Sequence, residues 1–146
     1  MAEVKMPSGA RRFGYFISIA INFMVMYAVN NLHKWNTPYL TDRYSEVLWA
    51  INLSLSAAIF VQFIFMLFDR KWFRSLMKSL TNIFSFISVY VFRQVFPLDL
   101  SESMARTANL GLVILLLLIL LSTLIELINS IKFYKNKLNG WFGNLI

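Results

Sequence analysis

The hydrophobic positions of this chain fall into four long and nearly continuous blocks, separated by short polar stretches. Each block holds about 19 to 27 residues. At a rise of about 1.5 Å per residue, a helix of that length crosses a hydrocarbon core of about 30 Å. We therefore predict four membrane-spanning helices, at roughly residues 13–32, 46–68, 79–97 and 105–131.

Helices are favoured over a barrel because the blocks do not alternate between apolar and polar positions. A lone helix also satisfies its own backbone hydrogen bonds in lipid. Pro97 is expected to end or kink the third helix. The sequence thus predicts an all-α membrane protein, a compact antiparallel four-helix bundle with short loops, forming one transmembrane domain over residues 1–146. A basic interfacial segment at 69–78 and a basic, aromatic tail at 132–146 complete it.

Composition supports the membrane class, because 58% of the 146 residues are hydrophobic. The absence of cysteine excludes disulfides and thiolate metal sites. The formal charge of +7 could indicate nucleic acid, but the basic residues lie beside the hydrophobic blocks. Contact with anionic lipid is the simpler interpretation, and no nucleic-acid partner is expected.

The distribution of Lys and Arg predicts the orientation, because positive charge is retained on the cytoplasmic side. Three segments are basic and two are not, and they alternate along the chain, which predicts that both termini are cytoplasmic. The basic segments carry Lys5, Arg11 and Arg12, then Arg70, Lys71, Arg74 and Lys78, then Lys132, Lys135 and Lys137; the other two carry Lys34, Arg43 and Arg106. Trp35, Tyr39, Tyr44 and Trp49 are expected to form an aromatic belt at the outer membrane interface.

The segment from Arg70 to Lys78 can form an amphipathic helix with an apolar face. Such a helix would lie in the headgroup layer and contact anionic lipid. An ordinary cytoplasmic connector is the alternative. The expected headgroup contacts are Arg70, Lys71, Arg74 and Lys78.

Polar residues inside the spans are the candidates for function, because polar groups at depth are costly. Glu126 is the only acid well inside a span. It could be a proton or cation site, a structural carboxyl bonded to polar neighbours, or a group that reaches the interface. Depths estimated from the helix ends predict one polar layer around Glu126, with Ser18, Gln62 and Ser85, and Asn22 just above it.

A second polar set is expected near the outer face, where Asn30, Asn52 and Asn109 could all be partners of Arg93. Such groups are most simply interhelical hydrogen bonds, each contributing about 0.6 to 2 kcal/mol. An anion or substrate site is the alternative.

Enzyme activity is not expected, because the sequence holds one histidine and no familiar catalytic, phosphate-binding or metal-binding motif. No cofactor or metal is expected either. The remaining hypotheses are an oligomeric channel or transporter for an ion or small solute, and a non-catalytic accessory or scaffold subunit of a larger membrane complex.

The stretch Arg11 to Tyr15, followed by the Asn30-Asn31-Leu32 run, Trp35, Ile51 to Ser54 and Phe96-Pro97, resembles small uncharacterised bacterial four-span membrane proteins. The resemblance covers most of the chain and implies architecture and a bacterial inner (plasma) membrane, but no activity. Small multidrug exporters are also four-span, with a key glutamate in the first helix. Residues 13–32 contain no acid, so that pattern does not match.

Overall fold

Four long helices make up most of the protein in the computed structural model, which describes residues 9–35, 37–68 and 70–143, with side chains to residue 136. They are α1 (Gly9–Asn31), α2 (Ser45–Leu67), α3 (Lys71–Val95) and α4 (Glu102–Gly143), and two short 3₁₀ helices, η1 (Leu32–Trp35) and η2 (Asp42–Tyr44), precede α2. Within those ranges there is no strand. Each long helix is long and apolar enough to cross a membrane, as predicted.

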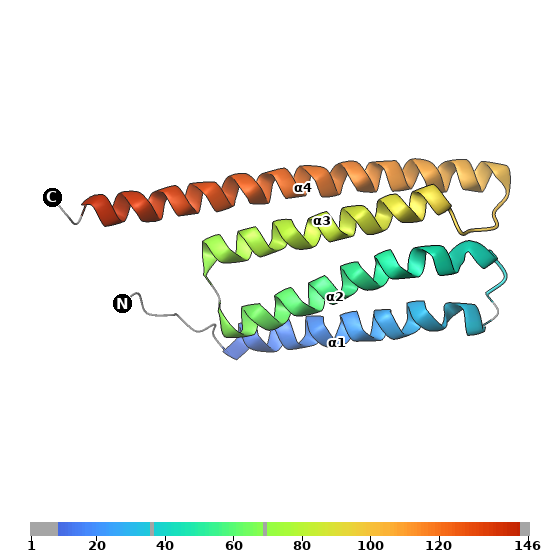
Figure 1. Cartoon of the computed structure of the whole chain (residues 1–146), viewed down its shortest axis with the longest axis horizontal. Coiled ribbons are helices and arrows are strands. Elements are labelled where there is room, and N and C mark those ends of the chain that lie inside the picture. The colour runs from blue at the N-terminus through green and yellow to red at the C-terminus, as the bar shows by residue number, and fades with distance from the viewer. Residues whose placement is uncertain (1–8, 36, 69, 144–146) are drawn as a thin grey trace.

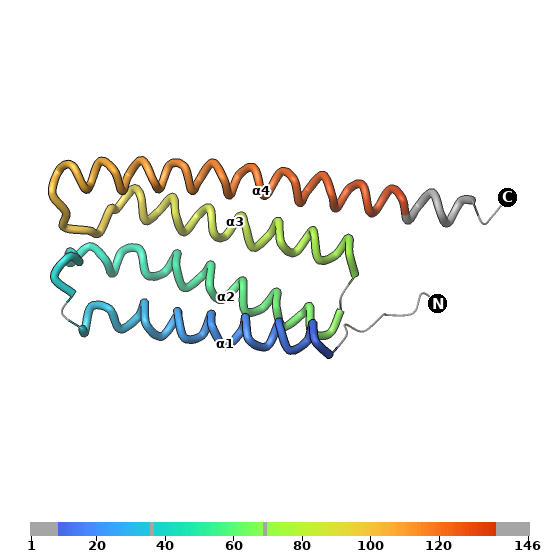
Figure 2. Tube along the Cα trace, turned by 180° about the vertical axis from the view of Figure 1, so that it is seen from behind, coloured from blue at the N-terminus to red at the C-terminus, as the bar shows by residue number. Residues whose placement is uncertain are grey.

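The helices form a row in chain order rather than a closed bundle (Figure 1). The extensive contacts are between α1 and α2, α2 and α3, and α3 and α4. The chain reverses direction at each connection, and the view from behind shows the same order, with α1 and α4 at the two edges (Figure 2). The four helices pack side by side as in a helical bundle, but they form an open layer and not the compact bundle expected from the sequence, because each helix packs mainly on its sequence neighbours.

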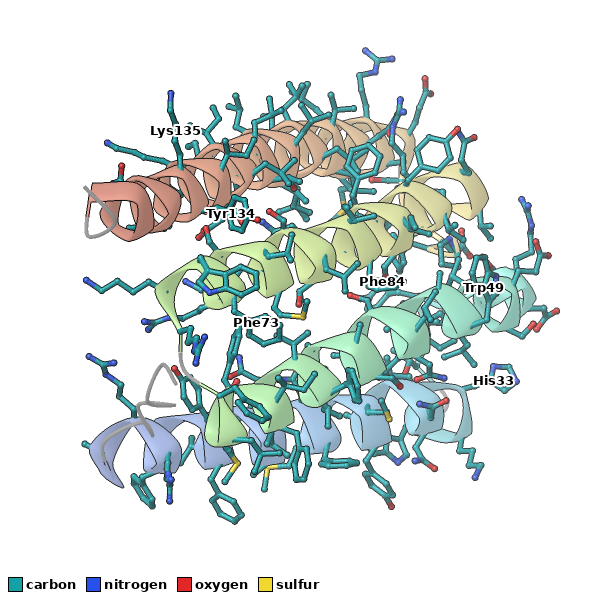
Figure 3. The ribbon with its side chains drawn as sticks, turned by 60° about the vertical axis from the view of Figure 1, so that its left-hand side comes forward. His33, Trp49, Phe73, Phe84, Tyr134 and Lys135 are labelled. Carbon is teal, nitrogen blue, oxygen red and sulfur yellow. The ribbon has the colours of Figure 1, made fainter. Side chains whose placement is uncertain are left out.

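The start of α1, the α2–α3 connection and the end of α4 lie at one end of the row, the basic end (Figure 1). The α1–α2 and α3–α4 connections lie at the other end, the loop end. Trp49 and His33 mark the loop end, and Tyr134 and Lys135 mark the basic end (Figure 3).

The two connections at the loop end are joined by their backbones. Leu40 and Leu98 form an isolated antiparallel bridge. The N–H of Thr41 donates to the carbonyl of Pro97 at 3.0 Å, and the N–H of Asp99 donates to the carbonyl of Tyr39 at 2.9 Å. We call this pair of hydrogen bonds the loop bridge. It satisfies backbone groups that would otherwise need water at the membrane boundary.

The end of α3 follows the prediction, and its beginning does not. Phe96 adopts a left-handed conformation (φ 43°) just before the buried Pro97, and the helix ends at Val95. At the other end, residues 71–78 are the first two turns of α3 and not a separate interfacial element. Similarly, α4 continues through the basic tail to Gly143 instead of ending near residue 131.

The small buried core is concentrated along α2, the helix that packs on both α1 and α3. Val47, Ala50, Val61 and Phe65 are buried there. Tyr44, expected at the outer aromatic belt, is instead only 4% exposed and donates its hydroxyl to the carbonyl of Val29 at 2.9 Å. The belt assignment is therefore wrong for Tyr44, whereas Trp35, Tyr39 and Trp49 are exposed.

Candidate functional site

Glu126 lies between α3 and α4 and has two partners on α3. Ser75, which is buried, donates its hydroxyl to the Glu126 carboxylate and also approaches the Glu126 backbone carbonyl at 2.8 Å. The Lys78 ammonium lies 3.8 Å from the other carboxylate oxygen. The Glu126 side chain is 23% exposed and that of Lys78 54%. The carboxylate is therefore held by a hydroxyl on one side and a cation on the other.

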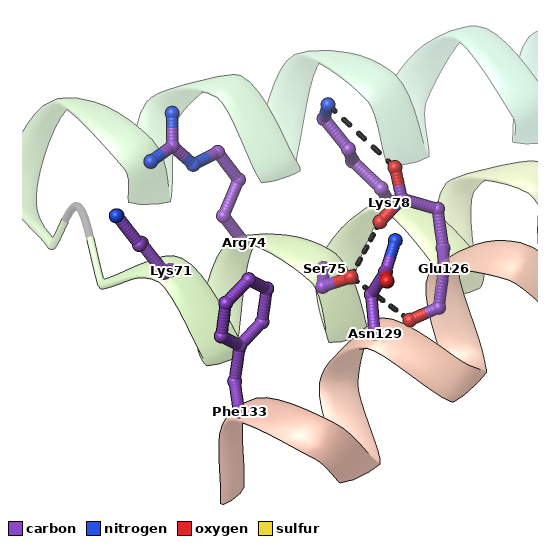
Figure 4. Close-up of a pocket in the computed structure, with 7 residues that line it drawn as sticks. All are labelled: Lys71, Arg74, Ser75, Lys78, Glu126, Asn129 and Phe133. Carbon is purple, nitrogen blue, oxygen red and sulfur yellow. Dashed lines mark hydrogen bonds and ion pairs between the residues drawn. The ribbon is translucent and has the colours of Figure 1, made fainter. Parts of the chain in front are cut away.

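A hollow of about 290 Å³ opens beside this carboxylate, between the first turns of α3 and the opposite part of α4 (Figure 4). We call it the basic hollow. Three cations line it, together with one carboxylate, one amide and an aromatic ring. Its lining residues are Lys71, Arg74, Ser75 and Lys78 from α3, and Glu126, Asn129 and Phe133 from α4.

A second hollow, of about 310 Å³, lies between α2, α3 and α4 and shares Lys78 and Glu126 with the first. We call it the inner hollow. Gln62 of α2 lines it, and the buried carbonyl oxygen of that side chain has no hydrogen-bond partner within the described part of the chain. Asn82 also lines it and donates to the hydroxyl of Ser122 at 3.1 Å. Glu126 and Lys78 thus stand at the junction of two polar hollows.

The expected layer around Glu126 is assembled only in part. Gln62 and Glu126 line the inner hollow together, but Ser18 and Ser85 are not among its lining residues. The Ser85 hydroxyl instead lies 3.3 Å from that of Ser54 on α2. Asn22 donates to the carbonyl of Ser18, one turn earlier in its own helix, at 2.8 Å.

Ser75 and Lys78 were not predicted as partners of Glu126. The sequence places both in the basic segment 69–78, outside the predicted third span, so the depth estimate pairs Glu126 with residues further along α3. A signal was present, since Ser75, Ser79 and Asn82 recur at the spacing of one helix face. The structure buries Ser75 and Ser79 on that face of α3.

The expected outer cluster separates into two pairs. Asn30 and Asn52 exchange amide hydrogen bonds of 2.7 and 2.9 Å between α1 and α2. Arg93 donates to the side-chain carbonyl of Asn109 at 2.9 Å, between α3 and α4. Of the three proposed partners of Arg93, only Asn109 is observed to bond it.

An apolar stretch separates the polar groups of α4. Ser122 and Asn109 are 13 residues apart, which is about 20 Å along a helix. Between them Leu116 is buried, and Leu120 lines a small apolar hollow of about 200 Å³ with Ile83 and Phe86 of α3. The α3–α4 contact is therefore polar near both ends and apolar in the middle.

The charged side chains are also divided between the two ends of the row. Of the expected headgroup contacts, Lys71 and Lys78 are exposed, and Arg70 and Arg74 are half-buried. All four lie at the basic end, where Arg11 and Arg12 are in the first turn of α1 (Figure 1). Lys5 and the side chain of Lys137 lie outside the described residues. The loop end holds Lys34, Arg43 and Arg106, with Asp42, Glu46, Asp99 and Glu102.

Comparison with known proteins adds no family: no family model, curated protein or solved structure matches the chain. The described side chains contain no group of three His, Cys, Asp or Glu that could hold a metal ion. The chemistry that the site offers is therefore that of one carboxylate, one hydroxyl, several cations and neutral amides. Such groups suit binding and proton exchange.

Proposed function

We propose that the protein moves an ion or small solute across a membrane, working as a homo-oligomer, with Glu126 in the path. The site that supports this best is the carboxylate shared by the basic hollow and the inner hollow. A carboxylate within a spanning helix is costly unless it is bonded, paired or hydrated, and such residues commonly lie on ion pathways. Hydrogen bonding to Ser75 and pairing with Lys78 leave the group beside two spaces that water can enter.

The orientation is part of the proposal. Eight described Lys and Arg side chains lie at the basic end, and the four described acids outside the spans lie at the loop end. This distribution supports cytoplasmic termini in a bacterial inner membrane. In that orientation Glu126 is reached from the cytoplasm through the basic hollow. The antiparallel course of the four helices fits the same assignment.

The oligomer is argued from the shape of the row. The apolar middle of the α3–α4 contact interrupts a polar route between these two helices. With α1 and α4 at the two edges of an open row, the four helices of one chain do not form a ring (Figures 1 and 2). A path across the membrane would therefore form where copies of the chain meet.

Proton flux into proteoliposomes tests the proposal, with a pH-sensitive dye inside and a potassium gradient as the driving force. Glu126→Gln removes the titratable group and keeps the shape, so we expect flux to fall at least about tenfold. The matched control is Glu102→Gln on the same helix, whose side chain is 93% exposed at the loop end and which should leave flux unchanged. Unchanged flux in Glu126→Gln would remove this residue from the path. Absence of flux of protons and small cations in the wild type would contradict a cation path through Glu126.

The second candidate is a non-catalytic accessory or scaffold subunit. The observation in its favour is α4, whose Leu and Ile side chains are mostly exposed along the edge of the row. In a larger complex a partner would cover this edge. The mass of the particle extracted directly into lipid nanodiscs separates the two candidates. A homo-oligomer favours transport, and a mass that is explained only by other chains favours the accessory role.

A further inference from the structure

We infer that the basic hollow is a binding site for a phosphate group, carried by the headgroup of an anionic phospholipid. This inference does not rest on the transport proposal, since it concerns binding at the membrane surface.

Charge is the first argument for the ligand. Lys71, Arg74 and Lys78 bring three positive charges to the hollow, and Glu126 brings one negative charge. Lys78 lies beside Glu126, and Lys71 and Arg74 line the part of the hollow further from that carboxylate (Figure 4). A guanidinium and an ammonium side by side match the oxygens of a phosphate.

Geometry gives the second argument. Lys71 and Lys78 are seven residues apart on α3, as are Phe133 and Glu126 on α4, so the hollow extends about 10 Å along the helices. A volume of about 290 Å³ equals roughly ten water molecules at about 30 Å³ each, which is enough for a phosphate and its ester carbons. The side-chain amide of Asn129 adds a neutral donor to the same wall.

Depth favours a lipid over a free anion. The ring of Trp72 on α3 contacts that of Tyr134 on α4, with 6.4 Å between the ring centroids, and the two residues are next in sequence to Lys71 and Phe133 of the hollow. Trp and Tyr gather at the level of the headgroups, with acyl chains on one side and water on the other. Phe133 lines the hollow itself and offers an apolar surface to the first carbons of a lipid. The hollow is thus placed where a lipid phosphate resides.

A headgroup held there would tie α3 to α4 at the basic end. The N-terminal turn of α3, which begins at Lys71, adds the positive end of its helix dipole to the same space. The bound phosphate would also compete with Glu126 for Lys78. Removal of the Glu126 charge should therefore strengthen binding of the anion.

Native mass spectrometry of the full chain tests the site. The protein is equilibrated with equal amounts of phosphatidylglycerol and phosphatidylcholine of identical acyl chains, and the lipid retained per chain is counted. We expect each chain to retain one molecule of phosphatidylglycerol in preference to phosphatidylcholine. The double variant Lys71→Gln/Arg74→Gln should lower the preference about tenfold, and Lys71→Arg/Arg74→Lys should keep it.

The matched control is Lys132→Gln/Lys135→Gln, which removes the same charge from the same end but outside the hollow. It should change the preference less than about twofold. An equal loss in both double variants would overturn the inference, because attraction would then be diffuse. Absence of any preference in the wild type would overturn it as well.

Two further measurements sharpen the result. Glu126→Gln should raise the preference severalfold, and an unchanged or lower preference would contradict the site. Millimolar inorganic phosphate as competitor separates the sources of the ligand. Lipid that stays bound supports a headgroup site, whereas full displacement by phosphate overturns the lipid assignment and identifies a soluble phosphate compound as the ligand.

Discussion

Asn30 and Asn52 satisfy each other's amide groups across α1 and α2, with a donor and an acceptor from each side. Asn30 also donates to the carbonyl of Met26, one turn back in its own helix. This pair has the geometry of interhelical hydrogen bonds, and it leaves little capacity for a ligand. The structural interpretation made from the sequence is the one that these contacts favour.

Removal of either amide should therefore weaken the α1–α2 contact. We expect Asn30→Ala and Asn52→Ala each to lower the unfolding free energy by about 0.6 to 2 kcal/mol, and a double-mutant cycle to give a coupling of about 0.6 to 1.7 kcal/mol. Reversible unfolding in lipid discs gives both values. Asn31→Ala is the control, because Asn31 bonds the carbonyl of Tyr27 in its own helix. A coupling near zero would show that the two amides act independently.

Glu126 shows how far the sequence predicts the candidate site. The sequence identifies it as the only acid well inside a span and predicts that its carboxyl group needs polar partners. The identity of those partners depended on where α3 begins, and an error of two turns shifts the register of every facing residue. For that reason the sequence matched Glu126 with Ser85, whereas the structure brings it to Ser75 and Lys78.

At the scale of elements, α3 is the informative case. Its first two turns are basic and amphipathic and the rest is apolar, and this change of composition suggested two elements. The backbone needs no interruption there, because helical hydrogen bonding is indifferent to side-chain polarity. Long basic side chains can also reach the headgroups from a helix that enters the membrane.

Proline substitutions distinguish a continuous α3 from a helix that starts near residue 79. In a continuous helix Leu80→Pro removes an interior hydrogen bond and should cost about 3 kcal/mol or more in unfolding free energy. In a helix starting at residue 79 the same proline would lie in the first turn and be tolerated. Lys71→Pro is the control, since Lys71 is the first residue of α3. The unfolding free energy of both variants, measured in lipid discs, distinguishes the two cases. An unfolding free energy of Leu80→Pro equal to that of Lys71→Pro would contradict a continuous α3.

At the scale of the whole molecule, the number and type of the long helices followed from hydrophobic length, because the bilayer imposes it. The start of α3 and the end of α4 did not follow. The arrangement of the helices did not follow either. A closed bundle and an open row have the same spans, loops and charge distribution, and they differ only in whether α1 meets α4. Between apolar surfaces in lipid that choice depends on close packing, which hydropathy does not encode.

Orientation can be measured cleanly, since the chain has no native cysteine. With cytoplasmic termini, Ala10→Cys and Lys135→Cys should react with a membrane-impermeant maleimide only from the cytoplasmic side. Pro38→Cys and Ser101→Cys should react only from the opposite side. Leu117→Cys, exposed on α4 within the apolar stretch, should stay unlabelled in intact membranes. Reaction of the first two residues from opposite sides would contradict the four-span topology.

The loop bridge makes the mutual register of the two hairpins, α1–α2 and α3–α4, independent of the side chains that stand there. Its donors and acceptors are main-chain atoms of Tyr39, Thr41, Pro97 and Asp99. Most replacements at positions 39 to 41, 98 and 99 keep those atoms, so these connections can diverge widely in sequence without moving one half of the protein against the other. Proline at 41 or 99 is the exception, since it deletes a donor. These connections thus tolerate many substitutions and still align the two hairpins, a role that the identity of their side chains does not reveal.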